Sequence, residues 1–373
     1  DFLIAVGTDL HIDPDARDEG AINPLTRYNQ EITRGLIWDA KKEGVDILLL
    51  LGDLVNGGKK KQHEALCKLL KEAKKEELPV FVLPGNHDLT KIDRDDFILF
   101  YEDYGYGDAL SQDESSLSYS VRCGNHLFIM IDTGGYSLSE SYASVSPETL
   151  LWIEEQLKYG EKEGLDVIAA GHYPILTEQA TDFVGKDDLK ALLLSYQVPL
   201  YLCCHLHSKS VIYNAGLTEL ATNQTISFPV SYSLIMRRAD TSYEYLPRLI
   251  GMEGFAKEKR LKDKNLINFS SYAYDLYKER AEGTVDILKR DRALSAADEE
   301  AAKDFIFQLE DYSWKGKLLE KSEALLSHPG YPVFMELAAG TNYEPWIPAV
   351  LHNKNPYLNG FRLKNGEISP YVD

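Results

Sequence analysis

The sequence predicts an α/β fold followed by a C-terminal helical region. In the first 250 residues, short apolar runs alternate with amphipathic stretches, which is the pattern of βαβ units. From residue 251 onward, long charged and aromatic stretches are typical of helices, and little strand signal separates them. A chain of 373 residues also exceeds the ~250 to 300 residues at which a single core stops growing. We therefore expect two domains, residues 1–250 and residues 251–373.

The expected elements of the first domain begin with two strand and helix pairs. A strand over residues 3–7 leads into a helix whose apolar side chains recur every three or four positions, from Leu25 to Ala40. Residues 46–51 are nearly continuous in apolar side chains, which is typical of a buried strand. A lysine-rich helix and another strand are expected over residues 60–76 and 79–83.

The remaining elements follow from turn and capping signals. Gly124 and Asn125 form a turn between two expected strands. Ser146 and Pro147 supply an N-cap and a first-turn proline for a helix that ends near residue 162. We expect strands over residues 117–122, 126–131, 166–170, 199–204, 209–214 and 232–238, and helices over residues 255–289 and 293–326.

The composition disfavours several classes of partner and site. The formal charge of −19 argues against duplex nucleic acid or an anionic membrane, because both are bound through clustered Lys and Arg. Four irregularly spaced cysteines do not suit a disulfide scaffold or a thiolate zinc site. No apolar run approaches the ~18 to 20 residues of a membrane helix. A small phosphate-ester substrate remains compatible with the charge.

Five short motifs with ligand-type side chains lie at the ends of expected strands. In an extended chain, residues i and i+2 point to one side, so Asp9 and His11 can reach a common site. Side chains at the carboxyl ends of strands converge where α/β sheets bind ligands. The glycine before each of the three middle motifs is expected to let the backbone turn sharply. The motifs are Asp9-Leu10-His11, Gly52-Asp53, Gly85-Asn86-His87, Gly171-His172 and His205-Leu206-His207.

These motifs supply more oxygen and nitrogen ligands than one metal ion requires. Any one of the histidines alone would more often be a packed or exposed side chain, and only the ordered set predicts a metal site. An excess of such ligands indicates a two-metal site, which suits in-line displacement at phosphorus. The seven candidate ligands are Asp9, His11, Asp53, Asn86, His172, His205 and His207.

The series D-x-H, GD, GNH, GH and H-x-H, in this order, resembles the calcineurin-like metallophosphoesterase family over about residues 3–238. The resemblance implies a four-layer fold, in which a two-sheet β-sandwich is flanked by helices. It also implies two ligand sets that share a bridging Asp53. One divalent ion would be held by Asp9, His11, Asp53 and His207, and the other by Asp53, Asn86, His172 and His205. Mn, Fe and Zn all suit these ligands.

Two positions depart from the family pattern. Cys204 precedes the H-x-H motif where the family usually has glycine, and Asn56 stands where the second motif often has Asp or Tyr. Without that tyrosine, the chain gives no support for a tyrosinate-bound ferric ion.

The same resemblance implies that His87 is a catalytic residue rather than a metal ligand. It would stabilise charge on the phosphate and protonate the leaving oxygen. Asp88 is expected to orient the His87 ring and raise its basicity. The implied reaction is hydrolysis of a phosphomonoester or phosphodiester by in-line attack of a metal-bridging hydroxide, without a covalent enzyme intermediate.

Two alternatives to a small-molecule phosphoesterase stay open at this point. A nuclease of the same superfamily is disfavoured by the charge of −19 and by the lack of a basic stripe. A non-catalytic, metal-stabilised binding protein is disfavoured by the pair His87 and Asp88, which such a site would not need. The helical region, residues 251–373, is expected to pack beside the metal crevice and to influence substrate choice.

Further expectations concern residues outside the motifs and the location of the protein. His63, on the lysine-rich helix, is expected at the surface, and Cys203 and Cys204 are expected to face opposite sides. The chain begins with Asp1 rather than Met, so we expect any leader to have been removed. Residues 5–11 and 52–64 resemble exported bacterial phosphoesterases. Export or association with a bacterial cell envelope is therefore expected, with a cytoplasmic location as the alternative.

Overall fold

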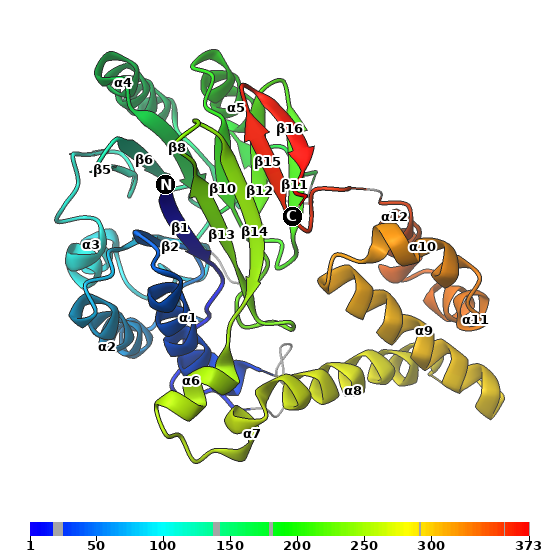
Figure 1. Ribbon diagram of the computed structural model, residues 1–373. Helices are drawn as coiled ribbons and strands as arrows, with labels where there is room; N and C mark the ends of the chain where they lie inside the picture. The colour runs from blue at the N-terminus through cyan, green and yellow to red at the C-terminus, as the bar shows by residue number, and fades with distance from the viewer. Residues whose placement is uncertain (18–24, 137–141, 179–181, 291, 354, 373) are drawn as a thin grey trace. The chain divides into compact units, whose positions relative to one another are not determined.

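The computed structural model describes residues 1–17, 25–136, 142–178, 182–290, 292–353 and 355–372. The chain forms two compact units (Figure 1). Unit 1 comprises Asp1–Gly251 and Gly360–Asp373, and unit 2 comprises Met252–Asn359.

Unit 1 is built on two seven-stranded mixed sheets, which carry the candidate ligands at one end. In the first sheet, β1, β2 and β3 run parallel and the other strands add antiparallel. Its strands in spatial order are β16 (Glu367–Pro370), β15 (Phe361–Lys364), β14 (Tyr243–Leu249), β13 (Ser231–Arg237), β1 (Phe2–Gly7), β2 (Ile47–Leu51) and β3 (Val80–Leu83).

In the second sheet, β12, β10, β8 and β6 run parallel, and β11, β5 and β4 pair antiparallel at its edges. The order is β11 (Ser210–Asn214), β12 (Leu217–Ala221), β10 (Leu200–Cys203), β8 (Asp166–Gly171), β6 (His126–Ile131), β5 (Tyr119–Cys123) and β4 (Ser111–Gln112). Two short strands, β7 (Tyr142–Ser144) and β9 (Asp182–Val184), pair separately.

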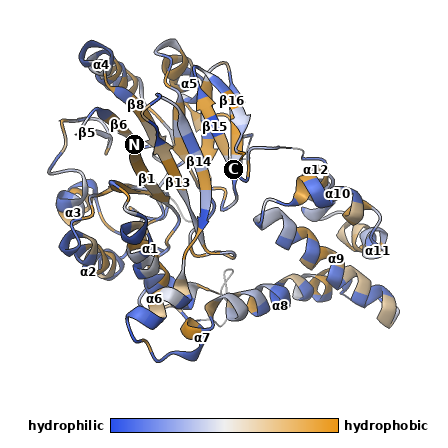
Figure 2. Ribbon diagram, in the orientation of Figure 1, coloured by the Kyte–Doolittle hydropathy of each residue, from blue (hydrophilic) through white to orange (hydrophobic). Residues whose placement is uncertain are grey.

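The two sheets pack face to face through aromatic and aliphatic side chains. The ring of Phe128 on β6 lies 6.3 Å from Phe2 and 6.5 Å from Phe81 of the first sheet, measured between ring centroids. All five residues of β2 and all six of β6 are buried. Figure 2 shows the strands as largely apolar and helices such as α2 and α4 as largely polar on their visible sides. The core of unit 1 therefore lies between the two sheets and between the sheets and the helices that cover them.

Helices cover the outer faces of the sheets and begin where the sequence provides caps. The Ser146 hydroxyl accepts a hydrogen bond from the Thr149 backbone at the start of α4, and Gly164 ends that helix with φ +64°. Apolar residues of α4 and α5 pack in one cluster with the second sheet. The helices of unit 1 are α1 (Asn29–Glu43), α2 (Lys60–Lys75), α3 (Arg94–Tyr101), α4 (Pro147–Glu163) and α5 (Lys186–Ser195), with 3-10 turns at Thr26–Tyr28 and Glu102–Tyr104.

Unit 2 is helical and has its own apolar core. Phe305 and Phe334 are among its fully buried side chains, and they come from α9 and α11. None of the helices in the described ranges is both long and apolar enough to cross a membrane. The helices are α6 (Met252–Glu258), α7 (Lys264–Ile267), α8 (Phe269–Lys289), α9 (Ala296–Trp314), α10 (Leu318–Leu326), α11 (Gly330–Ala338) and α12 (Tyr343–Leu351).

The predicted α/β fold, with two sheets flanked by helices and a C-terminal helical region, is confirmed. The prediction that the helical region extends to the last residue of the chain is wrong. The helical region was expected over residues 251–373, whereas β15 and β16 form a hairpin on the edge of the first sheet. Asn365 and Gly366 make its turn with φ of +53° and +75°. Each strand has only four residues, so the alternation was too short to be recognised beside the long helices. Strands β12 and β14 were also missed.

Candidate metal centre

The candidate ligands lie on loops that follow β1, β2, β3, β8 and β10, so the two sheets contribute to one site. Asp9 and His172 are fully buried, and Asp53 is 1% exposed. Loops from the first sheet also bind one another: the Asp9 backbone N–H donates to the Gly52 carbonyl at 3.1 Å, and that of His11 donates to the Asp53 carbonyl at 2.9 Å. The predicted convergence of the motifs is therefore present in the structure.

The backbone at this site adopts an uncommon conformation that differs from the one assumed from the sequence. Strand β1 ends at Gly7, so Asp9 and His11 lie in a loop and not in an extended strand. Left-handed backbone in a residue other than glycine costs on the order of 1 kcal/mol or more and is often found at functional sites. Five candidate ligands have φ between +43° and +66°: Asp9, His11, Asp53, His205 and His207.

The first four-residue cluster has the spacing of ligands around one cation. The ligand atoms of Asp9, His11, Asp53 and His207 all lie within 4.8 Å of one another. His11 Nε2 is 3.4 Å from His207 Nε2 and 3.6 Å from Asp53 Oδ2. Ligands about 2.1 Å from a common ion are separated by about 3 to 3.5 Å. The buried Asp9 oxygens accept no hydrogen bond from the described residues, and His207 Nε2 lies 3.5 Å from Oδ1. This donor set fits a divalent cation.

A second group of acceptor atoms faces the other oxygen of Asp53. His172 Nε2 lies 3.1 Å from Asn86 Oδ1 and 3.5 Å from Asp53 Oδ1. On its other side, His172 Nδ1 is 3.1 Å from the Leu51 carbonyl, which can only accept a hydrogen bond. Nδ1 therefore carries the proton, and Nε2 presents a lone pair to two oxygens. A cation bound between His172 Nε2 and the two oxygens would stabilise this arrangement.

His205 lies next to this second group. Its ring centroid is 5.2 Å from that of His172 and 4.1 Å from that of Tyr173. Asp53 thus has one oxygen directed at each group, with His11 on one side and His172 on the other.

Burial and neighbouring charges give the candidate ligands suitable protonation states. Burial lowers the pKa of His11 to about 4 and that of His205 to about 3, so both imidazoles are neutral near pH 7. Burial would raise the pKa of Asp9, but the close approach of His207, whose Nε2 lies 3.5 Å from Asp9 Oδ1, holds it below its usual range. The pKa of Asp53 is also lowered, because His172 and His11 outweigh the effect of burial. Asp9 and Asp53 are therefore carboxylates, and His11 and His205 are neutral imidazoles, whereas the effect of Asp9 outweighs that of burial and raises the pKa of His207.

His87 lies at the edge of the cluster, and its ring is held by a backbone carbonyl. Its Nδ1 is 2.8 Å from the Asn56 carbonyl oxygen, and its Nε2 is 3.7 Å from Asp53 Oδ2. The side chain is 24% exposed, whereas Asp53 is almost fully buried. Since a carbonyl only accepts, Nδ1 donates, and Nε2 is the atom available to a substrate.

The expectation that Asp88 orients His87 is wrong. Asp88 is fully buried, and its carboxylate points away from the His87 ring into the loop backbone. There it accepts hydrogen bonds of 2.8 to 3.1 Å from the N–H groups of Gly85, Val55 and Leu54. Burial raises the pKa of Asp88 to about 8. The His87 ring and the Asp88 carboxylate therefore bind different backbone groups of the loops.

His63 differs from what the sequence indicated, whereas Cys203 and Cys204 agree with it. His63 was expected at the surface but is fully buried, and it bonds the Asp88 carbonyl. The two cysteines face opposite sides as predicted: Cys203 packs in the core of the second sheet, and Cys204 Sγ is 2.5 Å from the Leu51 carbonyl. Burial raises the pKa of the Cys204 thiol well above its usual value, so it acts as a neutral donor.

Residues 2–209, more than half of the chain, match the family described as "Calcineurin-like phosphoesterase". The chain belongs to this family. Members of this family are phosphoesterases, which are hydrolases of phosphoric ester bonds. A second match covers residues 251–355 and is described as "C-terminal domain of cyclic nucleotide phosphodiesterase".

Two curated relatives and one solved structure are similar to this member of the calcineurin-like phosphoesterase family. "Probable glycerophosphodiester phosphodiesterase GpdQ" from Arcobacter nitrofigilis is 29% identical over 174 residues, which are 44% of this chain and only 58% of the relative. "Probable cyclic nucleotide phosphodiesterase" from Moraxella catarrhalis is 25% identical over 221 residues, 57% of this chain and 73% of the relative. A dimetal phosphatase from Danio rerio has the same fold, with a TM-score of 0.55, 15% identity, and coverage of 66% of this chain and 96% of its own.

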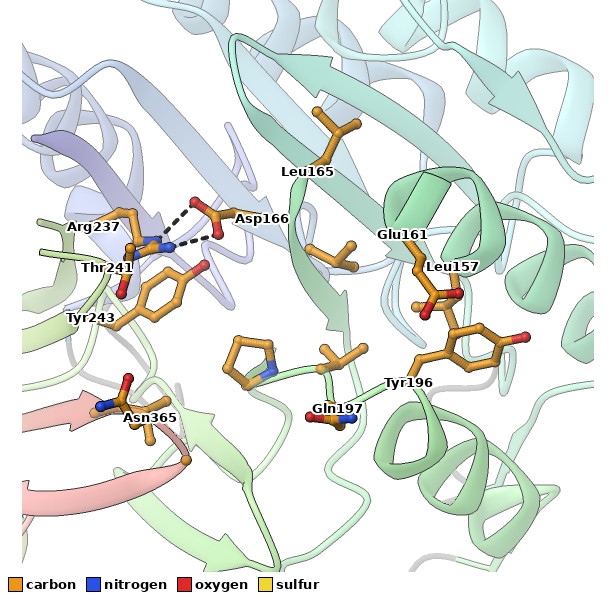
Figure 3. A pocket seen from close by; sticks show the side chains of 15 residues that line it. Leu157, Glu161, Leu165, Asp166, Tyr196, Gln197, Arg237, Thr241, Tyr243 and Asn365 are labelled. Atoms are coloured by element: carbon orange, nitrogen blue, oxygen red, sulfur yellow. Dashed lines mark hydrogen bonds and ion pairs between the residues drawn. The ribbon is translucent and has the colours of Figure 1, made fainter. Parts of the chain in front are cut away.

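A pocket of about 370 Å³ in the phosphoesterase unit lies at the opposite ends of the same strands. Its lining includes Asp166 at the start of β8 and Pro199 just before β10. Figure 3 shows the Arg237 guanidinium in a two-bond ion pair with Asp166 at one wall of this pocket. The pair neutralises the charge of both groups, and none of the predicted site residues lines the pocket.

Proposed function

We propose that the protein hydrolyses a small phosphodiester. The observation that carries this proposal is the second family match, because residues 251–355 resemble the C-terminal domain of cyclic nucleotide phosphodiesterase. The names of both curated relatives also describe phosphodiesterases. A small or exposed ester suits a chain with a charge of −19, which repels extended polyanions. The helical region is proposed to influence which ester is accepted.

The proposed site holds two divalent ions, in the two ligand sets that share Asp53. One set is Asp9, His11, Asp53 and His207, and the other is Asp53, Asn86, His172 and His205. Short distances between ligand atoms, from 3.4 to 3.6 Å, support the first set. In the second set, distances of 3.1 and 3.5 Å support Asn86, His172 and Asp53, and the ring of His205 lies 5.2 Å from that of His172. Bound divalent ions supply Lewis acidity, which polarises a phosphoryl group and activates water. Mn, Fe and Zn remain equally compatible.

His87 is proposed as the residue that stabilises and protonates the leaving oxygen. Its Nδ1–H donates to the Asn56 carbonyl, which fixes the ring plane and leaves Nε2 toward the site. The partial exposure of its side chain allows contact with a substrate. The Asn56 carbonyl takes the orienting role that the sequence had indicated for Asp88.

The proposal is tested by comparing diesters with monoesters on one enzyme preparation. Metal-stripped protein is reloaded with Mn, Zn or Fe(II) and assayed with bis(p-nitrophenyl) phosphate, p-nitrophenyl phosphate, 3′,5′-cyclic AMP and glycerophosphocholine. We expect kcat/KM to be higher for at least one diester than for the monoester. His87→Gln should lower kcat about 100-fold or more while metal content stays unchanged, since general acid catalysis contributes about 10²- to 10⁴-fold. A clear preference for the monoester would contradict the proposed substrate class.

A further inference from the structure

A second set of hydrogen bonds connects the loop that carries Asn86 and His87 to helices α2 and α3. His63 is on α2 and fully buried. Its Nε2 is 3.0 Å from the Asp88 carbonyl oxygen, and its Nδ1 is 2.8 Å from the hydroxyl of Tyr101 on α3. One side chain therefore links two helices to the loop.

The direction of these hydrogen bonds follows from the chemistry of the partners. The Asp88 carbonyl can only accept, so His63 Nε2 must carry a hydrogen. Burial lowers the pKa of His63 to about 4, and the ring is therefore neutral near pH 7 with a single N–H. Nδ1 must then accept from the Tyr101 hydroxyl. The chain of donors runs from Tyr101 through His63 to the backbone of Asp88.

Asp88 is held from two sides at the end of this loop. His63 bonds its backbone carbonyl, while its carboxylate accepts from the N–H of Gly85, at the other end of the same loop. A Cβ on Gly58 would lie 2.8 Å from the Asp88 carbonyl oxygen, so the neighbouring loop is also in close contact. Asn86 and His87 therefore lie in a short loop that is held by hydrogen bonds at Gly85 and at Asp88.

The packing around His63 does not by itself require a histidine. The ring centroid lies 6.0 Å from that of Phe97 and 5.4 Å from that of Phe100. A phenylalanine would fill this aromatic pocket equally well. What only the histidine provides is a donor and an acceptor on opposite sides of one ring.

We propose that His63 is a positioning residue of the phosphoesterase reaction. It holds the Gly85 to Asp88 loop so that Asn86 faces His172 and His87 faces Asp53. His63 itself touches neither the candidate metal ligands nor the substrate position. The inference rests on the proposed roles of Asn86 and His87, and the experiment below keeps the two apart.

Matched variants separate hydrogen bonding from packing. His63→Phe keeps the aromatic ring and removes both hydrogen bonds, and His63→Gln restores an N–H donor directed at the Asp88 carbonyl. His126→Phe is the control, because His126 is also buried but starts β6, remote from the loop. Kinetics on bis(p-nitrophenyl) phosphate with saturating Mn²⁺ give kcat and KM separately, and circular dichroism verifies that each variant is folded.

We expect His63→Phe to lower kcat about 10- to 100-fold, which is the usual effect of removing a partner that orients an active-site group. KM should change less than about threefold, because substrate contacts are intact. His63→Gln should recover most of kcat, and His126→Phe should match the unsubstituted protein. A folded His63→Phe variant with unchanged kcat, or a His63→Gln variant as slow as His63→Phe, would overturn the proposal.

Two further measurements keep the test decisive. If His63→Phe does not fold, His63→Gln becomes the test: it keeps a donor for the Asp88 carbonyl but loses the ring, and a folded His63→Gln variant with kcat lowered as far as in His87→Gln would overturn the proposal. If the unsubstituted protein hydrolyses no diester, the proposed function fails, while calorimetric titration with Mn²⁺ still tests the positioning role. Weaker Mn²⁺ binding by His63→Phe, with recovery in His63→Gln, supports that role, and unchanged binding contradicts it.

Discussion

Replacing His63 by phenylalanine should reduce the acid sensitivity of the fold. The pKa of His63 is lowered from about 6.5 to about 4 by burial. In the unfolded chain the ring takes up a proton near pH 6.5, whereas in the folded protein it does so only near pH 4. The stabilising contribution is therefore complete above pH 6.5 and is lost as the pH falls from 6.5 to 4. Between pH 7 and pH 5 this single group accounts for about 2 kcal/mol of unfolding free energy.

Urea unfolding of the metal-free protein at pH 7 and at pH 5 measures this contribution. The unsubstituted protein should lose about 2 kcal/mol more stability between the two pH values than His63→Phe loses. The variant is also expected to be less stable at pH 7, because the Asp88 carbonyl and the Tyr101 hydroxyl lose a partner, but this effect is the same at both pH values. Other titrating groups are common to both proteins and cancel in the comparison. Equal pH dependence of the two proteins would refute the assignment of His63 as a buried neutral donor.

Three further predictions concern the metal centre and the opposite end of the sheets. Mn²⁺ at about 100 times its Kd should stabilise the protein by about 2.7 kcal/mol for each occupied site, and Asp9→Asn should reduce the total gain because it removes a ligand of one of the two sets. Differential scanning fluorimetry with and without chelator measures this gain, and an undiminished Mn²⁺ shift in the variant would contradict the ligand assignment. Cys204→Ser keeps a donor for the Leu51 carbonyl and should retain kcat within about threefold. Cys204→Leu overfills the site and should lower the free energy of unfolding by about 1 to 3 kcal/mol. Equal stability of the two variants in urea would count against a close contact between residue 204 and the Leu51 carbonyl. Asp166→Asn removes the carboxylate that pairs with Arg237, whose side chain is only 10% exposed. The variant should lose about 2 kcal/mol of unfolding free energy in urea and keep its kcat. A large loss of kcat would show that the two ends of β8 are coupled.

The ligand motifs could be predicted from the sequence because they combine chemistry with position. Each follows a run of apolar residues that forms a strand, and parallel strands bring their carboxyl ends to one edge. The start of α4 was predictable for a similar reason, since Ser146 and Pro147 are local signals. The left-handed backbone of Asp9 and His11 was not predictable, because it depends on hydrogen bonds to a loop more than 40 residues away.

The sequence carries a signal for the burial of His63 in the spacing of its apolar neighbours. His63, Leu66 and Leu70 recur at helical spacing, and all three lie on the buried face of α2. The surrounding lysines favoured an exposed assignment. The partners of His63 were beyond prediction, since Tyr101 and Asp88 come from elements whose packing depends on the whole fold.

The glycines near the ligands have different physical roles, although the sequence suggested one role for all. Gly52 has φ +88°, so it makes the sharp turn that was expected before Asp53. Gly85 does not have positive φ; a Cβ there would collide with the backbone and carboxylate of Asp53. Gly171 is also needed for space, because a Cβ would meet the Tyr201 hydroxyl. Close approach between loops, and not turning alone, explains these two positions.

The Leu51 carbonyl shows how the site depends on contact between the sheets. Leu51 ends β2 in the first sheet, and its carbonyl is approached by His172 Nδ1 and Cys204 Sγ, both from the second sheet. Asp53 lies only two residues further along and has one oxygen facing each ligand group. Any shift between the sheets would therefore displace Asp53 from one group or the other. The departure from the family pattern at Cys204 is thus compatible with the site, because a buried neutral thiol adds a donor at the point where the spacing of the two groups is determined.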